Sequence, residues 1–167
     1  MKNGFKGQRP KGIILTSKMS RSKKINVRGL EEVDDPSYRY RMTPIQVTVQ
    51  KTKSVLTNLK EVAKDLERDP RMLIEYFKKR FGISLKYEES KDRAEVKGVD
   101  QDQFQTAVYE FIQFFVLCPT CRNPETVLSK RGEVLSIACK ACSHSDVVDV
   151  SNRAVSKAVD GILRVLP

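Results

Sequence analysis

The chain has few of the residues on which most enzymes depend. Its 167 residues include one histidine, His144, and four cysteines, and they contain no Ser/His/Asp or Cys/His pairing, no G-x-G-x-x-G run and no P-loop. No apolar run approaches the ~20 residues that a membrane span needs, and no secretory signal peptide is visible. These absences leave nothing that supports an active site of the chain's own, and they favour a protein of a reducing, cytoplasmic compartment that works by binding.

Acidic residues are absent from residues 1–30, which hold nine lysines and arginines. The net charge is +10, so the rest of the chain, with 22 basic and 21 acidic residues, is nearly neutral. A basic arm suits a polyanion, because each phosphate that it neutralises releases counterions. A solvated, disordered tail is a second interpretation, compatible with the first, whereas the glycines and Pro10 disfavour a transit peptide. We expect a flexible arm over residues 1–34.

All four cysteines lie in two C-x-x-C pairs, Cys118–Cys121 and Cys139–Cys142, with seventeen residues between the pairs. Two disulfides would need an oxidising compartment, and a redox C-x-x-C pair normally occurs once, beside a βαβ pattern. Four thiolates at a tetrahedral point fit Zn²⁺. The spacing therefore predicts a structural zinc ribbon, and because four thiolates complete its coordination, we expect His144 to be a solvated loop residue.

Hydrophobic periodicity predicts an alternation of strands and amphipathic helices before the cysteines. The expected strands cover residues 45–50, 55–56, 83–87 and 94–96, and the expected helices cover residues 59–66, 70–81 and 101–115. Ribbon strands are expected at residues 126–130, 133–138 and 147–150, and a last helix at residues 154–163. Asp69 and Asp100 are suited to begin helices, with Pro70 at a first helical position, and Gly82 is suited to end one.

These patterns predict an α+β protein with four parts. A disordered basic arm, residues 1–34, precedes a small mixed α/β domain, residues 35–116. The four-cysteine zinc ribbon, residues 117–150, and a C-terminal helix, residues 151–167, follow. The apolar face of that helix needs a partner surface, either on the α/β domain or on another protein.

The short link between the two helices at 59–66 and 70–81 leaves two interpretations open. A helix-turn-helix for DNA and a plain αα corner share this pattern, although the second helix is too apolar to lie in a groove.

Two long motifs resemble the N-terminal domain of the eukaryotic translation initiation factor 5 family. The first is Asp35-Pro-Ser-Tyr-Arg-Tyr-Arg-Met-Thr-Pro-Ile-Gln-Val47, and the second is Phe115-Val-Leu-Cys-Pro-Thr-Cys-Arg-Asn-Pro-Glu-Thr126. Cys139-Lys-Ala-Cys142 and the tail Gly161-Ile-Leu-Arg-Val-Leu-Pro167 are similar as well. The β subunit of initiation factor 2 shares this fold and ribbon, and Asp69-Pro-Arg-Met-Leu-Ile-Glu-Tyr-Phe77 is closer to that relative.

The resemblance implies a GTPase-activating module for initiation factor 2, acting on the small ribosomal subunit during start-codon selection. It implies that Arg39 is an arginine finger offered in trans to the GTP of the γ subunit, with Lys53 in support. A guanidinium at the γ-phosphate is worth about 10³ to 10⁵ in rate. Without the resemblance, Arg39 reads as a strand-edge arginine beside two packing tyrosines, Tyr38 and Tyr40. The implied partners are the γ and β subunits of factor 2, the small subunit with its RNA, initiator tRNA and other initiation factors, without a membrane.

The chain departs from the family pattern in several places. The glycine-rich turn after the first strand is shortened to Gln50-Lys-Thr-Lys53, Glu75 stands where the family has an activating lysine, and Ser143 stands where it has glycine. The arm is longer than usual, and the family's C-terminal helical-repeat domain has no counterpart in these residues.

Two other functions therefore stay open. One is a non-catalytic module like the β subunit of factor 2, which binds the γ subunit and initiator tRNA; the other is a ribosome- or RNA-binding ribbon protein without activation.

Overall fold

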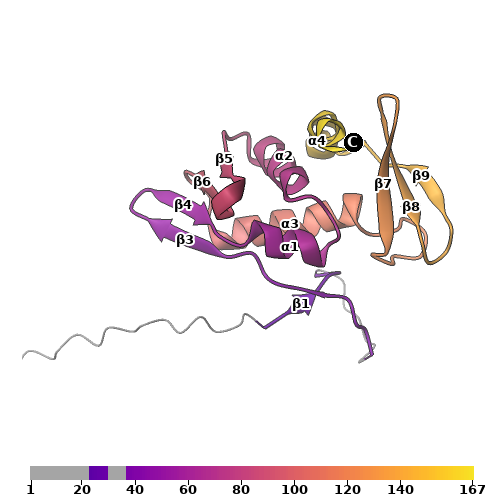
Figure 1. Cartoon of the computed structure of the whole chain (residues 1–167), viewed down its shortest axis with the longest axis horizontal. Helices are drawn as coiled ribbons and strands as arrows, with labels where there is room; N and C mark the ends of the chain where they lie inside the picture. The colour runs from indigo at the N-terminus through magenta and orange to yellow at the C-terminus, as the bar shows by residue number, and fades with distance from the viewer. Residues whose placement is uncertain (1–22, 30–36) are drawn as a thin grey trace, which may run out of the picture.

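The structure is a computed structural model that describes residues 23–29 and 37–167. Figure 1 shows the β3–β4 hairpin at one end of the molecule, helices in the middle and a three-stranded ribbon at the other end. The described part contains four α-helices and three sheets, with the four cysteines brought together in the ribbon. This arrangement confirms the predicted α+β fold. Most of the predicted arm, residues 1–22 and 30–34, lies outside the described residues.

A four-stranded antiparallel sheet with the strand order β3-β4-β6-β5 forms one side of the α/β body. Its strands are β3 (Val47–Gln50), β4 (Lys53–Leu56), β5 (Lys86–Glu88) and β6 (Arg93–Val96). The strand expected at 55–56 is longer, because the β3–β4 link needs only Lys51 and Thr52, with Lys51 at a φ of 55°. Conversely, the strand expected from residue 83 begins only at Lys86, after the chain leaves the preceding helix.

Three helices follow the expected boundaries closely: α1 (Leu59–Asp65), α2 (Pro70–Phe81) and α3 (Gln101–Phe115). Asp69 accepts from the Arg71 N–H at 2.8 Å, Gly82 ends α2 at a φ of 64°, and Asp100 forms a capping box with Gln103. Asn58 occupies the N-cap position of α1 without capping it; its amide instead binds the backbone of Gln46 and Pro44, at 2.8 and 2.9 Å. The local signals thus fix the helix ends, while Asn58 fastens the segment before β3.

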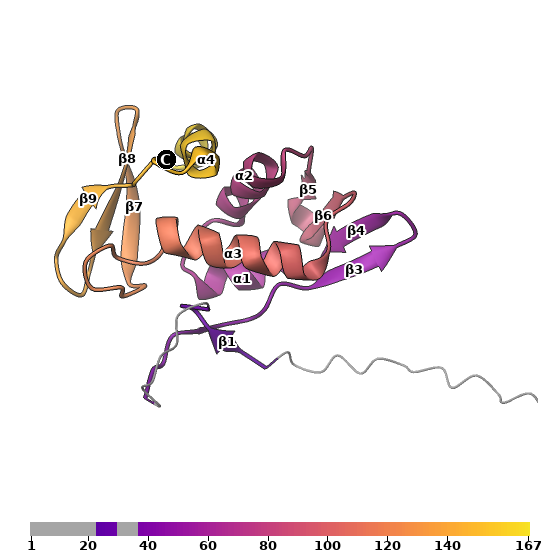
Figure 2. The same cartoon turned by 180° about the vertical axis from the view of Figure 1, so that it is seen from behind.

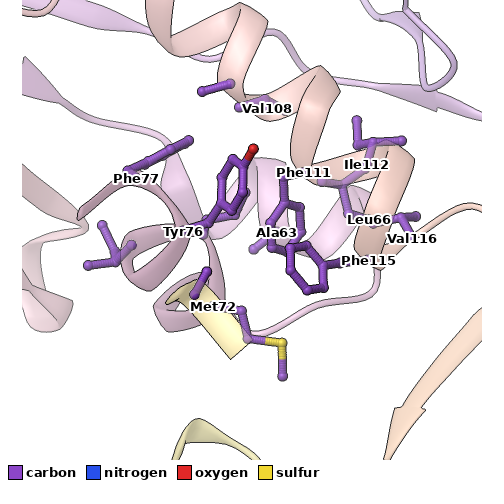
Figure 3. Packing of buried hydrophobic residues seen from close by; sticks show 14 of the residues in the cluster. Ala63, Leu66, Met72, Tyr76, Phe77, Val108, Phe111, Ile112, Phe115 and Val116 are labelled. Carbon is purple, nitrogen blue, oxygen red and sulfur yellow. The ribbon is translucent and has the colours of Figure 1, made fainter. Parts of the chain in front are cut away.

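Helix α2 packs against α1, α3 and α4 and buries its apolar side chains, while Arg71, Lys79 and Arg80 stay exposed. Its Tyr76 ring is fully buried and meets Phe111 and Phe115 of α3 edge to face, with ring centroids 5.8 and 5.9 Å apart (Figure 3). The Tyr76 hydroxyl donates to Glu110 at 3.1 Å. A helix buried in this way cannot enter a DNA groove, so α1 and α2 form a plain αα corner.

Helix α4 (Arg153–Val165) packs on α2, which gives the C-terminal apolar face its partner within the chain. Gly161 allows the close approach: a Cβ at this position would lie 2.5 Å from a carboxylate oxygen of Glu75. Glu75 is therefore half-buried at the α2–α4 contact, where it pairs with Lys78 at 2.8 Å.

Part of the segment assigned to the arm is folded against the body. Strand β1 (Ile25–Asn26) pairs antiparallel with β2 (Arg41–Met42), and Val27 is 2% exposed. Gly29, at a φ of 52°, lies directly on the ring of Tyr109. The segment has only two apolar residues that pack on the core, Ile25 and Val27, which is too few to show a periodic pattern in the sequence. Their burial still holds the segment against the surface that α1 and α3 form.

The ribbon sheet consists of β7 (Thr126–Arg131), β8 (Val134–Cys139) and β9 (Ser145–Val147). The third strand starts two residues earlier than its expected position at 147, because the Cys139 N–H donates to the His144 carbonyl at 2.8 Å and begins the ladder at once. No helix within the described residues is long and apolar enough to cross a membrane.

Candidate functional site

The four cysteine sulfurs converge as their spacing predicts. All four Sγ atoms lie within 4.8 Å of one another, and two pairs, Cys118–Cys142 and Cys121–Cys139, are each 3.6 Å apart. Tetrahedral coordination with metal–sulfur bonds of about 2.3 Å needs sulfurs about 3.8 Å apart. The cluster can therefore hold a metal ion, and four sulfurs would complete its coordination.

The two knuckles share one backbone feature. In the first, the Arg122 N–H donates to the Cys118 carbonyl at 3.0 Å, and the Thr120 N–H points to the Cys118 sulfur at 3.4 Å. The residue after each second cysteine is left-handed: φ is 59° at Arg122 and 61° at Ser143. This region favours glycine, so the backbone at Ser143 has a conformation that a glycine would adopt with less strain.

The thiols of the cluster influence one another's ionisation. Burial opposes ionisation of Cys118, but N–H groups of Cys121 and Thr120 and the neighbouring sulfurs lower its pKa to about 6. At Cys121 an N–H of Asn123 favours the thiolate, yet burial and the surrounding sulfurs raise its pKa to about 12. Four thiolates cannot share this volume without a cation, so the donor set fits a divalent metal that would deprotonate all of them.

Arg39 lies next to this cluster. Its side chain is 73% exposed, and its Nη2 donates to Glu125 Oε1 at 3.0 Å and to the Tyr40 hydroxyl at 3.1 Å. The Tyr40 hydroxyl donates to the same Glu125 oxygen at 2.8 Å, and the Arg39 guanidinium lies 5.1 Å from the centre of the Tyr40 ring. Hydrogen bonding to Tyr40, and then the charges of Tyr40 and Glu125, raise the pKa of Arg39. An exposed guanidinium is thus held in one place by two neighbours.

Glu125 is fixed by both knuckles of the ribbon. Its N–H donates to the Asn123 side chain at 2.8 Å, and Asn123 accepts through its carbonyl from Cys118 at 2.9 Å. The carbonyl of Glu125 accepts from Lys140, between the last two cysteines, at 2.9 Å. The position of Glu125, and through it that of Arg39, therefore depends on the folded cysteine cluster.

Lys53 is not brought to Arg39. It begins β4, at the end of the molecule away from the ribbon (Figure 2), and its Nζ pairs with Glu95 at 3.1 Å. The expected sites therefore divide into two places: Arg39 beside the cysteines, and Lys53 on the sheet.

Sequence reasoning missed Arg68, which joins the α/β body to the ribbon. This arginine is 9% exposed, and its guanidinium donates to the carbonyl of Phe115, at the end of α3, and to both the carbonyl and hydroxyl of Thr126 in β7, over 2.7–3.0 Å. Burial lowers the pKa of Arg68 to about 10. No periodicity or motif marks this residue, because every partner outside its own turn is distant in sequence.

Comparisons with known proteins place the chain in a family. A family model described as the domain found in initiation factors 2B and 5 matches residues 30–145. Eukaryotic translation initiation factor 5 of Caenorhabditis elegans is 36% identical over 126 residues, which is 72% of this chain and 29% of that protein. The probable eukaryotic translation initiation factor 5 of Schizosaccharomyces pombe is 36% identical over 132 residues, 75% of this chain and 33% of its own length.

The factor 5 of Saccharomyces cerevisiae is 33% identical over 129 residues, 73% of this chain and 32% of its own length. The chain thus spans about a third of the length of these relatives. The match over residues 30–145 covers the α/β body and the first two strands of the ribbon with all four cysteines. The chain therefore belongs to the family that shares this domain, and it is similar to eukaryotic translation initiation factor 5.

Proposed function

We propose that this chain is a GTPase-activating module that stimulates GTP hydrolysis by initiation factor 2 at start-codon selection. It contributes Arg39 in trans to the γ subunit and has no active site of its own. The observation that supports this most directly is the combination at Arg39 of exposure and restraint: the guanidinium is 73% exposed, yet Glu125 and Tyr40 hold it.

The chemistry required of an arginine finger is electrostatic. Charge develops on the γ-phosphoryl oxygens in the transition state, and a guanidinium that reaches them is worth about 10³ to 10⁵ in rate. Among the described residues, the Arg39 side chain makes hydrogen bonds only through Nη2, so its other N–H donors are available to a phosphate. A guanidinium that is already oriented loses less conformational freedom when it meets the nucleotide.

Glu125 and Tyr40 act as positioning residues in this proposal. Both bond to Nη2 and to each other through one carboxylate oxygen, which leaves the remaining donors of Arg39 in a fixed direction. The ribbon then has a role in activation, because Glu125 is held by the knuckles.

We propose zinc as the metal of the cluster, in a structural role. Four sulfurs at these separations suit Zn²⁺, and a closed site leaves no position for substrate. The proposed partners are the γ and β subunits of factor 2, the small ribosomal subunit and its RNA, initiator tRNA and other initiation factors, in the cytoplasm. In this proposal Lys53 supports activation through a separate contact with the GTPase, made by the β3–β4 end of the molecule and not through Arg39.

The position of Glu75 bears on the activating surface. This carboxylate replaces a family lysine, but it lies half-buried against Gly161 at the α2–α4 contact and pairs with Lys78. In this chain the reversed charge is therefore largely covered by α4, which makes it compatible with activation through Arg39.

Single-turnover GTP hydrolysis by the factor 2–initiator tRNA complex on small subunits tests the proposal. Arg39→Ala should abolish the acceleration given by the wild-type chain, while Arg41→Ala, a matched change of an exposed arginine two residues away, should keep it. Glu125→Gln should lower the maximal rate several-fold without changing the concentration needed for half-maximal effect. Equal acceleration by Arg39→Ala and wild type would refute the finger.

The shared domain favours one further candidate, a non-catalytic module like the β subunit of factor 2. A pull-down with the γ subunit separates the two functions. Stable one-to-one assembly without ribosomes, together with no acceleration of hydrolysis, would assign the chain to the β-subunit type.

A further inference from the structure

A basic hollow lies between α2 and the start of α4, away from Arg39 and the cysteine cluster. Its volume is about 340 Å³, and its charged lining consists of Lys79 and Arg80 from α2, Glu110 from α3, and Arg153 and Lys157 from α4. We call the four cations the α2–α4 basic surface. From this surface we propose a binding site for the phosphate backbone of structured RNA.

The single acid of the hollow does not neutralise the surface. Glu110 is bound by Arg80 through both oxygens, one of them at 3.0 Å, and by the Tyr76 hydroxyl at 3.1 Å. The bond from Arg80 outweighs burial and lowers the pKa of Glu110, which keeps this ion pair intact at neutral pH. Lys79, Arg153 and Lys157 make no ion pair within the described part of the chain, so the lining has a net charge of +3.

The positive charge comes from side chains and not from the end of α4. The first N–H groups of the helix, on Ala154 and Val155, already donate to the Asn152 side chain at 2.9 and 3.3 Å. Arg153 and Lys157 are four residues apart, so they project from one side of α4, and both are exposed while Val155 and Ile162 face the core. The cations are therefore presented together to solvent.

The lining favours RNA over a protein partner. Ala154 is its only apolar residue. Protein–protein interfaces centre on apolar or aromatic anchors buried in well-packed pockets, and this hollow offers nothing for such an anchor to contact. Interfaces with nucleic acid are more polar and much more positive, as here.

The surface is separate from the proposed site of activation. Strand β1, which pairs with the strand that follows Arg39, lies on one side of α3, and α4 lies on the other (Figure 2). One face can therefore meet RNA while the other meets a GTPase. The inference deepens the proposed function by assigning RNA contact to a defined surface, but it does not require Arg39 to act.

Binding of the full chain to a short labelled RNA duplex of mixed sequence, followed by fluorescence anisotropy over a range of salt, tests the proposal. The affinity falls as salt rises, with a slope of log K against log salt of about −0.9 for each phosphate contact. The variant Lys79→Gln/Arg153→Gln/Lys157→Gln should therefore make this slope shallower by about 2 to 3. The control Lys60→Gln/Lys64→Gln/Lys97→Gln removes the same charge from exposed positions on α1 and after β6. Equal slopes and affinities for the two variants, at wild-type circular dichroism, would overturn the proposal.

A change of opposite sign completes the test. Asp160 is exposed, one turn beyond Lys157 on the same side of α4, so Asp160→Asn should tighten RNA binding a few-fold. Polyglutamate of matched charge is the competing probe. If it binds as tightly as RNA and loses affinity equally in the Lys79/Arg153/Lys157 variant, the surface belongs to an acidic protein and the RNA proposal fails. Because no GTPase is present, these results are independent of the outcome for Arg39.

Discussion

Arg68 offers the sharpest test of how the two halves of the molecule are joined. Its guanidinium donates to the carbonyls of Glu67, Phe115 and Thr126 and to the Thr126 hydroxyl, at distances of 2.7–3.0 Å. Phe115 ends α3 and Thr126 begins β7, so one side chain connects the αα corner, the central helix and the ribbon. Replacement by methionine keeps much of the volume and removes every donor.

The expected loss of stability is a difference between two terms. An unpaired buried acceptor costs about 1–3 kcal/mol, and the Phe115 and Thr126 carbonyls, both buried at the junction, would lose their Arg68 donors. Burial of the charge opposes this: the fall of the Arg68 pKa from 12.5 to about 10 corresponds to roughly 3 kcal/mol that methionine would recover. The two carbonyls together cost about 2–6 kcal/mol, the relieved charge burial offsets roughly 3 kcal/mol, and loss of packing adds to the cost, so we expect Arg68→Met to destabilise the fold by about 1–3 kcal/mol.

Urea unfolding followed by circular dichroism measures this change. Arg71→Met is the control, since that arginine is exposed and, within residues 23–29 and 37–167, forms an ion pair only with Asp69 on its own turn. Arg68→Lys keeps the charge but cannot reach Phe115 and Thr126 together, so it should be destabilised as well. Hydrogen exchange should accelerate first at the junction of α3 and β7. A stability of Arg68→Met equal to or above that of wild type would show that charge burial outweighs the hydrogen bonds, and would refute the reasoning.

Three further predictions concern the ribbon and the docked N-terminal segment. Ser143→Gly should stabilise the ribbon by up to about 1 kcal/mol, because φ is 61° at this position, and an unchanged melting temperature would contradict it. Removal of the metal by a chelator should unfold residues 118–150, so circular dichroism that is unchanged after verified metal loss would refute the structural role. At Asp65 burial is outweighed by hydrogen bonds from Lys24 and Thr43, which lower its pKa. The stabilisation that ionised Asp65 gives to the folded state should be complete above about pH 4 and be lost as pH falls through the lowered pKa. The difference in melting temperature between wild type and Asp65→Asn should therefore shrink in acid. A difference that stays constant with pH would rule this out.

The features predicted correctly from sequence are those whose cause is local. Asp69, Gly82 and Asp100 mark helix ends because each acts on backbone within a few residues. The two C-x-x-C pairs predict the cysteine cluster for the same reason: each pair sets its own knuckle, and one hairpin brings the pairs together.

The features that sequence did not reveal depend on contacts between distant segments. Asparagine is a residue type that commonly caps helices, but the Asn58 amide hydrogen-bonds the backbone of the segment before β3 and does not cap α1. Nothing near Arg39 in sequence indicates Glu125, which is 86 residues away. Likewise, Lys24 and Val27 belong to a stretch without periodicity, and only the surface made by α1 and α3 explains why they are docked.

The direct passage from α3 into the first knuckle restricts how the chain can vary in length. Helix α3 ends at Phe115, whose carbonyl Arg68 holds, and only Val116 and Leu117 separate it from Cys118. One residue of extended chain spans about 3.3–3.6 Å, so inserting or deleting one residue in this short link would displace the cysteine cluster from the end of α3 and carry Glu125 away from Arg39. The turn after Arg131, by contrast, joins β7 to β8 at the end of the hairpin away from the cysteines, since the pairing runs from Thr126 and Cys139 to Arg131 and Val134. Insertions should be tolerated at that turn, and the link from Phe115 to Cys118 should keep its length wherever Arg39 is paired with Glu125.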